Sequence, residues 1–184
     1  MTKYAAFLRG INVGGNKPVP MEKLKKAFES LEFRKVQTLL VSGNVVFEAP
    51  PIDTVALEQK VEEKLKKVFG HEIGVLIRTM EELQHLSNSQ PFKKVAITAQ
   101  TRLYVTFFSE KPKSSLKIPF TSPDKSCKIL HLSGREVCSV VVLSPNSGTL
   151  DLMKILEKEF GRKVTTRNWN TLVRVLRTYQ LKEK

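Results

Sequence analysis

The chain has 184 residues, of which 41% are hydrophobic and 27% charged, and it carries a net charge of +13. This composition provides for a hydrophobic core and excludes a disordered chain, and the length suits one good-sized domain or two small ones. The apolar runs, such as residues 140–143, are too short to span a bilayer, and the N-terminus does not have the pattern of a secretory signal, so we expect a cytoplasmic protein without a membrane partner.

The first half of the chain predicts six elements in the order strand, helix, strand, strand, helix, strand. Hydrophobic residues at helical spacing indicate the two helices. The expected strands cover residues 3–9, 35–41, 44–48 and 73–78; the expected helices cover residues 20–31 and the stretch from a cap at Asp53 or Thr54 to Gly70. This order is that of a ferredoxin-like unit, in which the first and third strands are central and antiparallel.

The second half repeats part of this pattern after a short helix at 80–86 and a linker-like stretch at 87–100. We expect strands at 103–109, 128–132, 136–143 and 163–165, and helices at 150–160 and 168–180. A stretch rich in Pro and Ser, residues 111–123, stands where the first half has a helix.

Two short matches indicate an internal duplication. Val41-Ser42-Gly43 matches Leu132-Ser133-Gly134, and Phe69-Gly70 matches Phe160-Gly161, each at an offset of 91 residues (43 to 134 and 70 to 161). We therefore predict an α+β protein with two tandem ferredoxin-like lobes, each with an antiparallel sheet. The expected domains are a first lobe at 1–78, a helix and linker at 79–101, and a second lobe with a C-terminal helix at 102–184.

The segment from Leu8 to Asn16 is the first candidate for a binding site. It places Arg9 at the end of the first strand and Gly14-Gly15 in the following loop, where positive φ angles let backbone N–H groups converge on an anion. The loop is neither a Walker A sequence nor the dinucleotide fingerprint, and a plain turn between strand and helix is the alternative. In the predicted lobe, the end of the first strand lies beside the turn Ser42-Gly43-Asn44.

Residues 165–171, Thr-Thr-Arg-Asn-Trp-Asn-Thr, form the second candidate at the start of the last helix. Free N–H groups and the helix dipole favour anions at such a position. Helix capping accounts for one or two of these polar residues, but not for Arg167, Asn168 and Asn170 together. Trp169 falls on the apolar stripe of the helix, which predicts a core position.

The candidate ligand-binding residues come from these two segments and from the turn between the second and third strands. They are Arg9, Asn12, Gly14, Gly15, Asn16, Ser42, Asn44, Arg167, Asn168 and Asn170. No Ser–His–Asp set, paired carboxylates or metal-ligand spacing occurs, so the catalytic residues stay unknown, and the sequence predicts no metal and no cofactor. Whether the protein is an enzyme stays open; an enzyme built from Arg, Asn, Ser and Thr would act by positioning and charge stabilisation.

Cys127 and Cys138 lie on the two arms of a predicted hairpin that turns near Gly134. With that turn, the residue opposite Cys127 would be near position 142, so a cross-strand disulfide is geometrically poor. We expect two free, buried thiols in a reducing compartment.

Three functions fit these observations. The first, which the polar segments favour, is a small-molecule or phosphate-binding module. The second is a nucleic-acid-binding protein, because residues 160–182 contain six basic residues and no acidic one. Against it, both faces of residues 4–8 are apolar and are expected to be covered, which leaves no platform for bases. The third is a ligand-free structural or partner-binding protein, and the sequence leaves the oligomeric state open.

Three motifs resemble one known family. They are Leu-Arg-Gly-Ile-Asn-Val-Gly-Gly-Asn at 8–16, Ser-Gly-Asn-Val-Val-Phe at 42–47 and Thr-Arg-Asn-Trp-Asn-Thr at 166–171; Pro91-Phe92 is similar to the family's Asn-Pro-Phe element, with Gln90 in place of the Asn. The chain resembles a large, mostly bacterial family known as domain of unknown function 1697. The resemblance implies a cytosolic, two-lobed α+β protein and brings no established reaction, substrate or cofactor.

Overall fold

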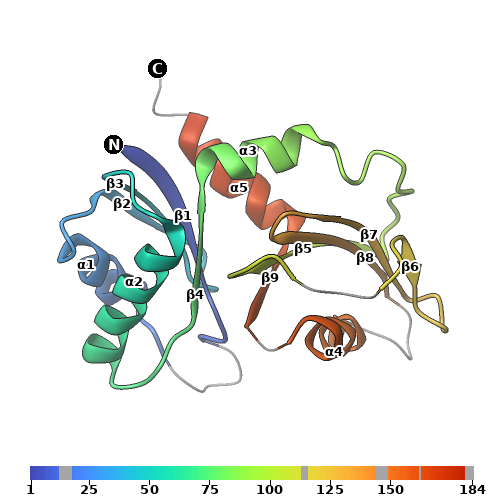
Figure 1. Ribbon diagram of the computed structural model, residues 1–184, viewed down its shortest axis with the longest axis horizontal. Helices are drawn as coiled ribbons and strands as arrows, with labels where there is room; N and C mark the ends of the chain where they lie inside the picture. The colour runs from blue at the N-terminus through green and yellow to red at the C-terminus, as the bar shows by residue number, and fades with distance from the viewer. Residues whose placement is uncertain (13–17, 113–115, 144–148, 162, 181–184) are drawn as a thin grey trace. The chain divides into compact units, whose positions relative to one another are not determined.

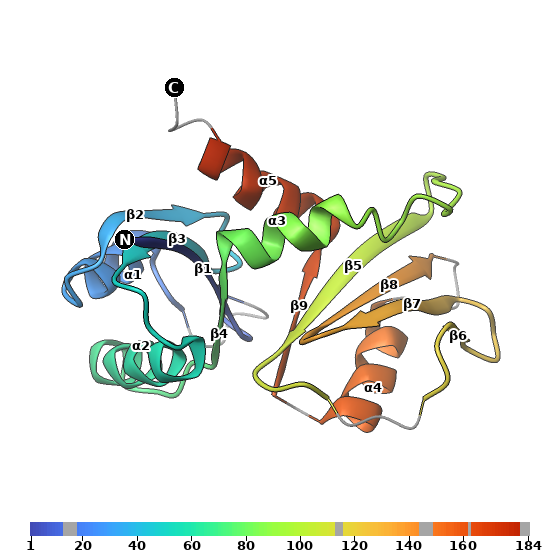
Figure 2. The same ribbon diagram turned by 45° about the horizontal axis from the view of Figure 1, so that its top comes forward.

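The structure, a computed structural model, describes residues 1–12, 18–112, 116–143, 149–161 and 163–180 (Figures 1 and 2). These residues form an α+β protein with five helices and two antiparallel sheets. The chain divides into two compact units: unit 1 contains Met1–His85 and the residues from Arg174 onward, and unit 2 contains Leu86–Val173. Helices α3 (Met80–Asn88) and α5 (Trp169–Gln180) therefore each contribute residues to both units.

Unit 1 contains the βαββαβ series that the sequence predicts. Its elements are β1 (Thr2–Leu8), α1 (Met21–Glu29), β2 (Arg34–Leu39), β3 (Asn44–Ala49), α2 (Thr54–Phe69) and β4 (Val75–Thr79). The strand order is β2-β3-β1-β4, so β1 and β3 are the central pair and run antiparallel, as expected. Helices α1 and α2 both cover one face of this sheet (Figure 1).

Local sequence explains where α2 begins and ends. Asp53 Oδ1 accepts hydrogen bonds from the N–H groups of Val55 and Ala56, at 3.0 and 3.1 Å, and so caps the first turn. Gly70 ends the helix at a φ of 78°, in the left-handed region that glycine adopts without strain.

The core of unit 1 lies between the two helices and the sheet. Alternate side chains of β1 point toward the helices, and the rings of Phe28, Phe33 and Phe47 pack against one another there. Ala5 and Phe7, on the opposite face of β1, are also buried. Both faces of this strand are therefore covered, as its apolar pattern predicts.

Unit 2 contains a five-stranded sheet with α4 packed on one face (Figure 2). Its elements are β5 (Thr101–Phe108), β6 (Phe120–Thr121), β7 (Cys127–Ser133), β8 (Glu136–Val142), α4 (Thr149–Phe160) and β9 (Val164–Asn168). The strand order is β6-β7-β8-β5-β9. When β5, β7, β8 and β9 are matched with β1, β2, β3 and β4, the two sheets have the same order, and β6 is an additional edge strand.

Two parts of unit 2 differ from the sequence prediction. The stretch rich in Pro and Ser contains β6, a two-residue strand that pairs with β7. The strand predicted at 163–165 extends to Asn168, because residues 164–168 pair with β5 along their whole length. Local sequence does not show this pairing, since β5 is distant along the chain and pairing overrides local preference.

Cys127 and Cys138 are buried, free thiols, as predicted. Cys127 lies opposite Val141 and Cys138 lies opposite His131, so the two cysteines do not face each other across the hairpin. Burial raises the pKa of the Cys138 thiol from 9.0 to about 12, which keeps this group protonated at neutral pH.

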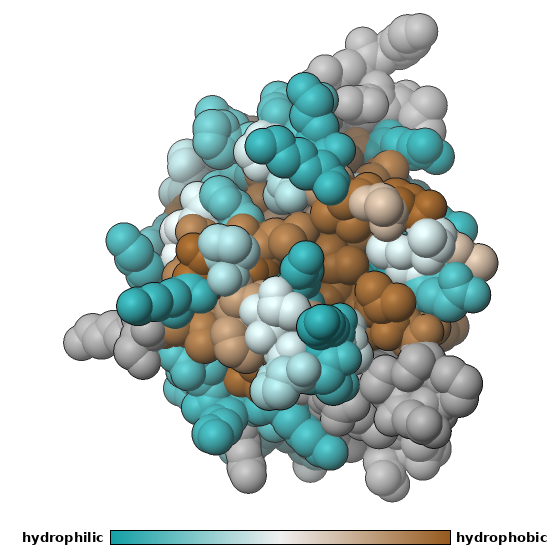
Figure 3. Space-filling model, turned by 90° about the vertical axis from the view of Figure 1, so that its right-hand side faces the viewer, coloured by the Kyte–Doolittle hydropathy of each residue, from teal (hydrophilic) through white to brown (hydrophobic). Residues whose placement is uncertain are grey.

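Some apolar side chains reach the surface of unit 2. Figure 3 shows apolar residues gathered on one side of the molecule. In unit 2, Ile97 is 64% exposed and Val142 is 46% exposed. Across the described ranges, no helix is both long and apolar enough to cross a membrane.

Candidate functional site

The first two motifs meet in unit 1, where the end of β1 lies against the turn between β2 and β3. The N–H group of Leu8 donates to Gly43 O at 2.8 Å. Gly43 has a φ of 73°, and a Cβ atom on it would collide with Ile11 Cδ1. The turn therefore requires glycine for two reasons, its backbone conformation and its contact with Ile11.

Asn12 joins these two segments through its side chain. Its Nδ2 group donates to Val19 O at 3.1 Å and to Val41 O at 2.8 Å, while its Oδ1 accepts from the N–H of Val19 at 2.8 Å. Both amide hydrogens are thus engaged by backbone carbonyls. Asn12 holds the chain on either side of the glycine-rich segment and fixes it to the β2–β3 turn; the predicted residues Gly14, Gly15 and Asn16 lie outside the described residues.

Asn44 has a similar supporting role in the turn. It is completely buried, and its Nδ2 group donates to Leu39 O at 2.9 Å and to Ser42 Oγ at 3.1 Å. Ser42 itself is exposed. The polar residues of the second motif therefore shape the turn, and Ser42 is the one at the surface.

Two glutamates of α2 accept hydrogen bonds from backbone N–H groups on the outer edge of β4. Glu62 Oε1 accepts a hydrogen bond from the N–H of Val75 at 2.8 Å, and Glu58 Oε1 accepts one from the N–H of Ile77 at 2.7 Å. Because β4 is the last strand of its sheet, these carboxylates occupy the edge at which another strand would pair. The sequence pattern gave no indication of this role.

Arg9 lies at the end of β1 near one of these carboxylates. The backbone N–H of Arg9 donates a hydrogen bond to Gly74 O at 2.8 Å. A methyl group on Gly74 would lie 3.8 Å from Arg9 Cδ and 4.0 Å from Glu62 Oε1, so both side chains border the same point. Arg9 and Glu62 therefore both lie close to Gly74.

The third motif lies in unit 2 and forms most of β9. Thr166 Oγ1 is 2.8 Å from Thr106 Oγ1 on the neighbouring strand. Asn168 Oδ1 accepts from the N–H of Asn170 at 2.9 Å at the start of α5, which is the capping role expected for one polar residue of this motif. Asn170 is exposed.

Arg167 is the charged residue of this motif. Its Nη1 group donates to Thr166 O at 3.0 Å. Burial lowers the pKa of Arg167 from 12.5 to about 10, so the guanidinium remains charged at neutral pH in a poorly solvated place. Arg9 belongs to unit 1 and Arg167 to unit 2.

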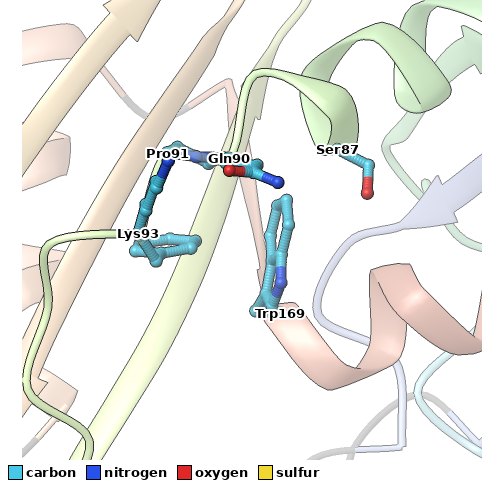
Figure 4. Close-up of a pocket in the computed structure, with 6 residues that line it drawn as sticks. Ser87, Gln90, Pro91, Lys93 and Trp169 are labelled. Atoms are coloured by element: carbon cyan, nitrogen blue, oxygen red, sulfur yellow. The ribbon is translucent and has the colours of Figure 1, made fainter.

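A pocket of about 390 Å³ lies in unit 2 (Figure 4). It is lined by Ser87, Gln90, Pro91, Phe92, Lys93 and Trp169, which come from the end of α3, the following loop and the start of α5. Trp169 is half-buried and lines this pocket, whereas its place on the apolar stripe predicted a core position. The reason is that the end of α3 and the loop that follows it leave part of the indole uncovered, and such a loop has no periodic pattern that predicts its path.

Successive turns fix the backbone of the pocket loop. The N–H of Gln90 donates to Ser87 O at 3.1 Å, and the N–H of Lys93 donates to Gln90 O at 3.0 Å. Gln90 has a φ of 48°, which is uncommon for a residue other than glycine. The ring of Phe92 meets that of Trp169 edge to face, with 5.0 Å between their centroids and 74° between their planes.

The chemistry of this pocket suits binding. Its lining residues provide one ammonium group, an amide, a hydroxyl and two aromatic rings, and they include no carboxylate. Within the part of the chain that the structure describes, no group of three or more His, Cys, Asp or Glu residues is placed to hold a metal ion.

Comparison with known proteins supports the sequence resemblance. A family described as "Protein of unknown function (DUF1697)" matches residues 1–137. The chain belongs to the DUF1697 family. The match includes the first two motifs and Pro91-Phe92, and it ends before the third motif.

A solved structure is similar to this DUF1697 chain over nearly its whole length. It is the conserved bacterial protein SP0830 from Streptococcus pneumoniae, with 22% sequence identity and a TM-score of 0.70, and the match covers 96% of this chain and 97% of that chain. At this identity, the similarity concerns the fold. A comparison with curated proteins found no match.

Proposed function

We propose that this DUF1697 chain is a small-molecule-binding protein of the cytoplasm and that the pocket between residues 87–93 and Trp169 is its binding site. The observation that carries the proposal is a pocket of about 390 Å³ beside a half-buried tryptophan. Ligand pockets are commonly about 300–1,000 Å³, with apolar walls and a few convergent polar groups. The free thiols of Cys127 and Cys138 fit a reducing compartment.

Anion binding at the end of β1 is a separate part of the proposal. Arg9 supplies the charge and Ser42 a surface hydroxyl, while Asn12 connects the end of β1 to the β2–β3 turn and Asn44 shapes that turn. Gly14, Gly15 and Asn16 stay candidates from the sequence. In unit 2, Arg167 and Asn170 are the candidates for binding an anion. Asn168 caps the start of α5. The contacts of Asn12 with Val19 and Val41 support this division of roles.

We also propose that the two units are tandem ferredoxin-like folds derived by duplication. The matching strand orders of the two sheets support this relationship. The boundaries at 1–78, 79–101 and 102–184 stay predictions.

The proposal is tested by measuring thermal unfolding of the full chain against a panel of nucleotides, sugar phosphates, aromatic acids and oligonucleotides. A ligand present at about 100 times its Kd stabilises the folded state by about 2.7 kcal/mol, which gives a measurable rise in Tm. We expect at least one small molecule to raise the Tm and to lose this effect in Trp169→Ala. Stabilisation by oligonucleotides alone would favour the nucleic-acid alternative, and no stabilisation by any compound would favour a ligand-free structural protein.

A further inference from the structure

We infer that the ligand of the unit 2 pocket is a planar ring compound with an anionic substituent, whose ring stacks on Trp169 and whose anion binds Lys93. This inference rests on the proposed function and names its ligand class. Three features of the pocket carry it: the accessible indole, the sign of its charge, and the polar groups of Ser87 and Gln90.

The indole of Trp169 is held in place on one side and accessible on another. Phe92 is only 8% exposed and packs its ring edge to face with Trp169, at 5.0 Å between centroids. Trp169 is itself half-buried and faces the pocket (Figure 4). A fixed aromatic surface favours flat ligands, because stacking gains contact area without ordering a flexible side chain.

The charge of the pocket favours an anion. Lys93 is exposed and lines the pocket, and no carboxylate is among the lining residues. A carboxylate or phosphate on the ligand would form a charge-assisted hydrogen bond with Lys93 Nζ. Lys94 is also exposed but does not belong to the lining, so it provides a matched control with the same charge.

The polar groups suit a ring that contains or bears heteroatoms. The amide of Gln90 offers two donor hydrogens and an acceptor oxygen, and the hydroxyl of Ser87 both donates and accepts. The φ of 48° at Gln90 is maintained by hydrogen bonds on both sides of the residue, to Ser87 O and from the N–H of Lys93. Figure 4 shows the Gln90 side chain near the edge of the Trp169 ring.

The test uses the fact that Trp169 is the single tryptophan of the chain. Its fluorescence, excited at a wavelength that the ligands do not absorb, reports directly on the pocket. Two comparisons separate the contribution of the ring to binding from that of the negative charge. They are benzoate against cyclohexanecarboxylate, and AMP against adenosine and ribose 5-phosphate. We expect benzoate and AMP to quench Trp169 saturably, and the compounds that lack either the ring or the anion to bind at least about 5-fold more weakly.

Variants then assign the two contacts, with binding followed by ligand-observed NMR. Lys93→Ala should weaken AMP binding roughly 5-fold or more, while Lys94→Ala should change it about 2-fold or less. Trp169→Ala should weaken it roughly 5- to 150-fold, and Trp169→Phe, which keeps a ring, should weaken it less. Thermal unfolding of each variant shows that the chain is folded.

The outcomes distinguish this inference from the proposed function. Equal binding of benzoate and cyclohexanecarboxylate, equal binding of AMP and adenosine, or equal effects of Lys93→Ala and Lys94→Ala would overturn the ligand class, although the pocket would remain a binding site. If no compound of the wider panel changes either Trp169 fluorescence or the Tm, the proposed function fails together with the inference.

Discussion

Arg78 and Arg167 lie in matching strands of the two sheets. Each donates a hydrogen bond from Nη1 to the carbonyl oxygen of the residue before it. In β4, Arg78 donates to Ile77 O at 2.8 Å; in β9, Arg167 donates to Thr166 O at 3.0 Å. Each arginine also lies opposite the long strand next to it, Arg78 against β1 and Arg167 against β5. The same arginine arrangement in corresponding strands supports the duplication that the sequence offsets predict.

The surroundings of the two arginines differ. Arg78 is completely buried, and its Nη1 lies 3.9 Å from Glu58 Oε1 of α2. Glu58 lies 12 residues before Gly70, and Thr149 lies 12 residues before Gly161, so Thr149 at the start of α4 occupies the position that corresponds to Glu58. The carboxylate that accompanies Arg78 is therefore not present at the matching helix position of unit 2.

Removal of the Glu58 carboxylate should destabilise unit 1 strongly. Glu58→Ala leaves the guanidinium of Arg78 buried without this carboxylate and the N–H of Ile77 without an acceptor, so we expect a loss of about 3–5 kcal/mol in urea denaturation. Glu58→Gln, which keeps an acceptor oxygen, should lose less. Glu63→Ala, an exposed site on the same helix, should change the free energy of unfolding by about 0.5 kcal/mol or less, and an equal loss at both sites would contradict the burial argument.

Comparing Gly43→Ala with Gly10→Ala should separate the steric cost of an added methyl group from the cost of a positive φ angle. The added methyl group would collide with Ile11 Cδ1 and lie 3.0 Å from Leu8 Cβ, at a φ of 73°. We expect a loss of about 2–5 kcal/mol in chemical denaturation. Gly10→Ala, at a φ of 61° with no atom within 4 Å of the new methyl, should lose only about 1–2 kcal/mol. Ile11→Val should partly rescue Gly43→Ala, and the steric explanation fails if it does not.

The buried thiol of Cys138 predicts a pH dependence of stability. Its pKa is raised to about 12, so above pH 9 the unfolded chain loses this proton while the folded chain keeps it, and stability falls as the pH rises from 9 to 12. A pKa shift of this size corresponds to a loss of about 4 kcal/mol in the free energy of unfolding at the upper end of this pH range. In Cys138→Ala this contribution is absent, so the difference in unfolding free energy between the natural chain and the variant should shrink across this range. A constant difference would contradict the prediction.

The sequence predicts the elements of unit 1 and the meeting of its first two motifs, because both follow from the hydrophobic period and the strand order. The sequence does not distinguish ligand-binding residues from supporting ones. Asn12 and Asn44 look alike as polar loop residues, and only the three-dimensional path of the turn shows that their amides bind backbone carbonyls. The amphipathic pattern of its helix predicts a core position for Trp169. The loop beside it has no periodic pattern, and its one sequence signal is the similarity of Pro91-Phe92 to the family's Asn-Pro-Phe element, which does not predict a pocket.

The two candidate anion-binding arginines can be tested by their effects on stability and on binding. We expect Arg9→Ala and Arg167→Ala to leave the unfolding of the free protein nearly unchanged and each to weaken phosphate binding, by roughly 10- to 150-fold. Calorimetric titration with inorganic phosphate and urea denaturation measure the two quantities. If both variants lose several kcal/mol without phosphate, the arginines are structural and the hypothesis that they bind anions fails.

The basic charge of the chain predicts oligonucleotide binding that is weak and dependent on salt. Both faces of β1 are buried, so bases have no aromatic surface of that strand on which to stack. Apart from a base at Trp169, contacts with phosphates are therefore the expected source of affinity for an oligonucleotide. For 6–10 phosphate contacts, the affinity should fall by roughly 10³–10⁵ between 50 and 200 mM salt. Fluorescence anisotropy with a labelled single strand measures this dependence.

Charge reversal tests which surface is responsible for that binding. Arg174 and Arg177 are exposed residues of α5 within the basic C-terminal segment, and Lys66 is an exposed residue of α2 outside it. If the C-terminal segment supplies the phosphate contacts, Arg174→Glu with Arg177→Glu should reduce both the affinity and the slope of its salt dependence, whereas Lys66→Glu should have a smaller effect. Sub-micromolar, sequence-selective binding that persists at physiological salt would contradict the prediction, because backbone contacts carry no sequence information and are screened by ions.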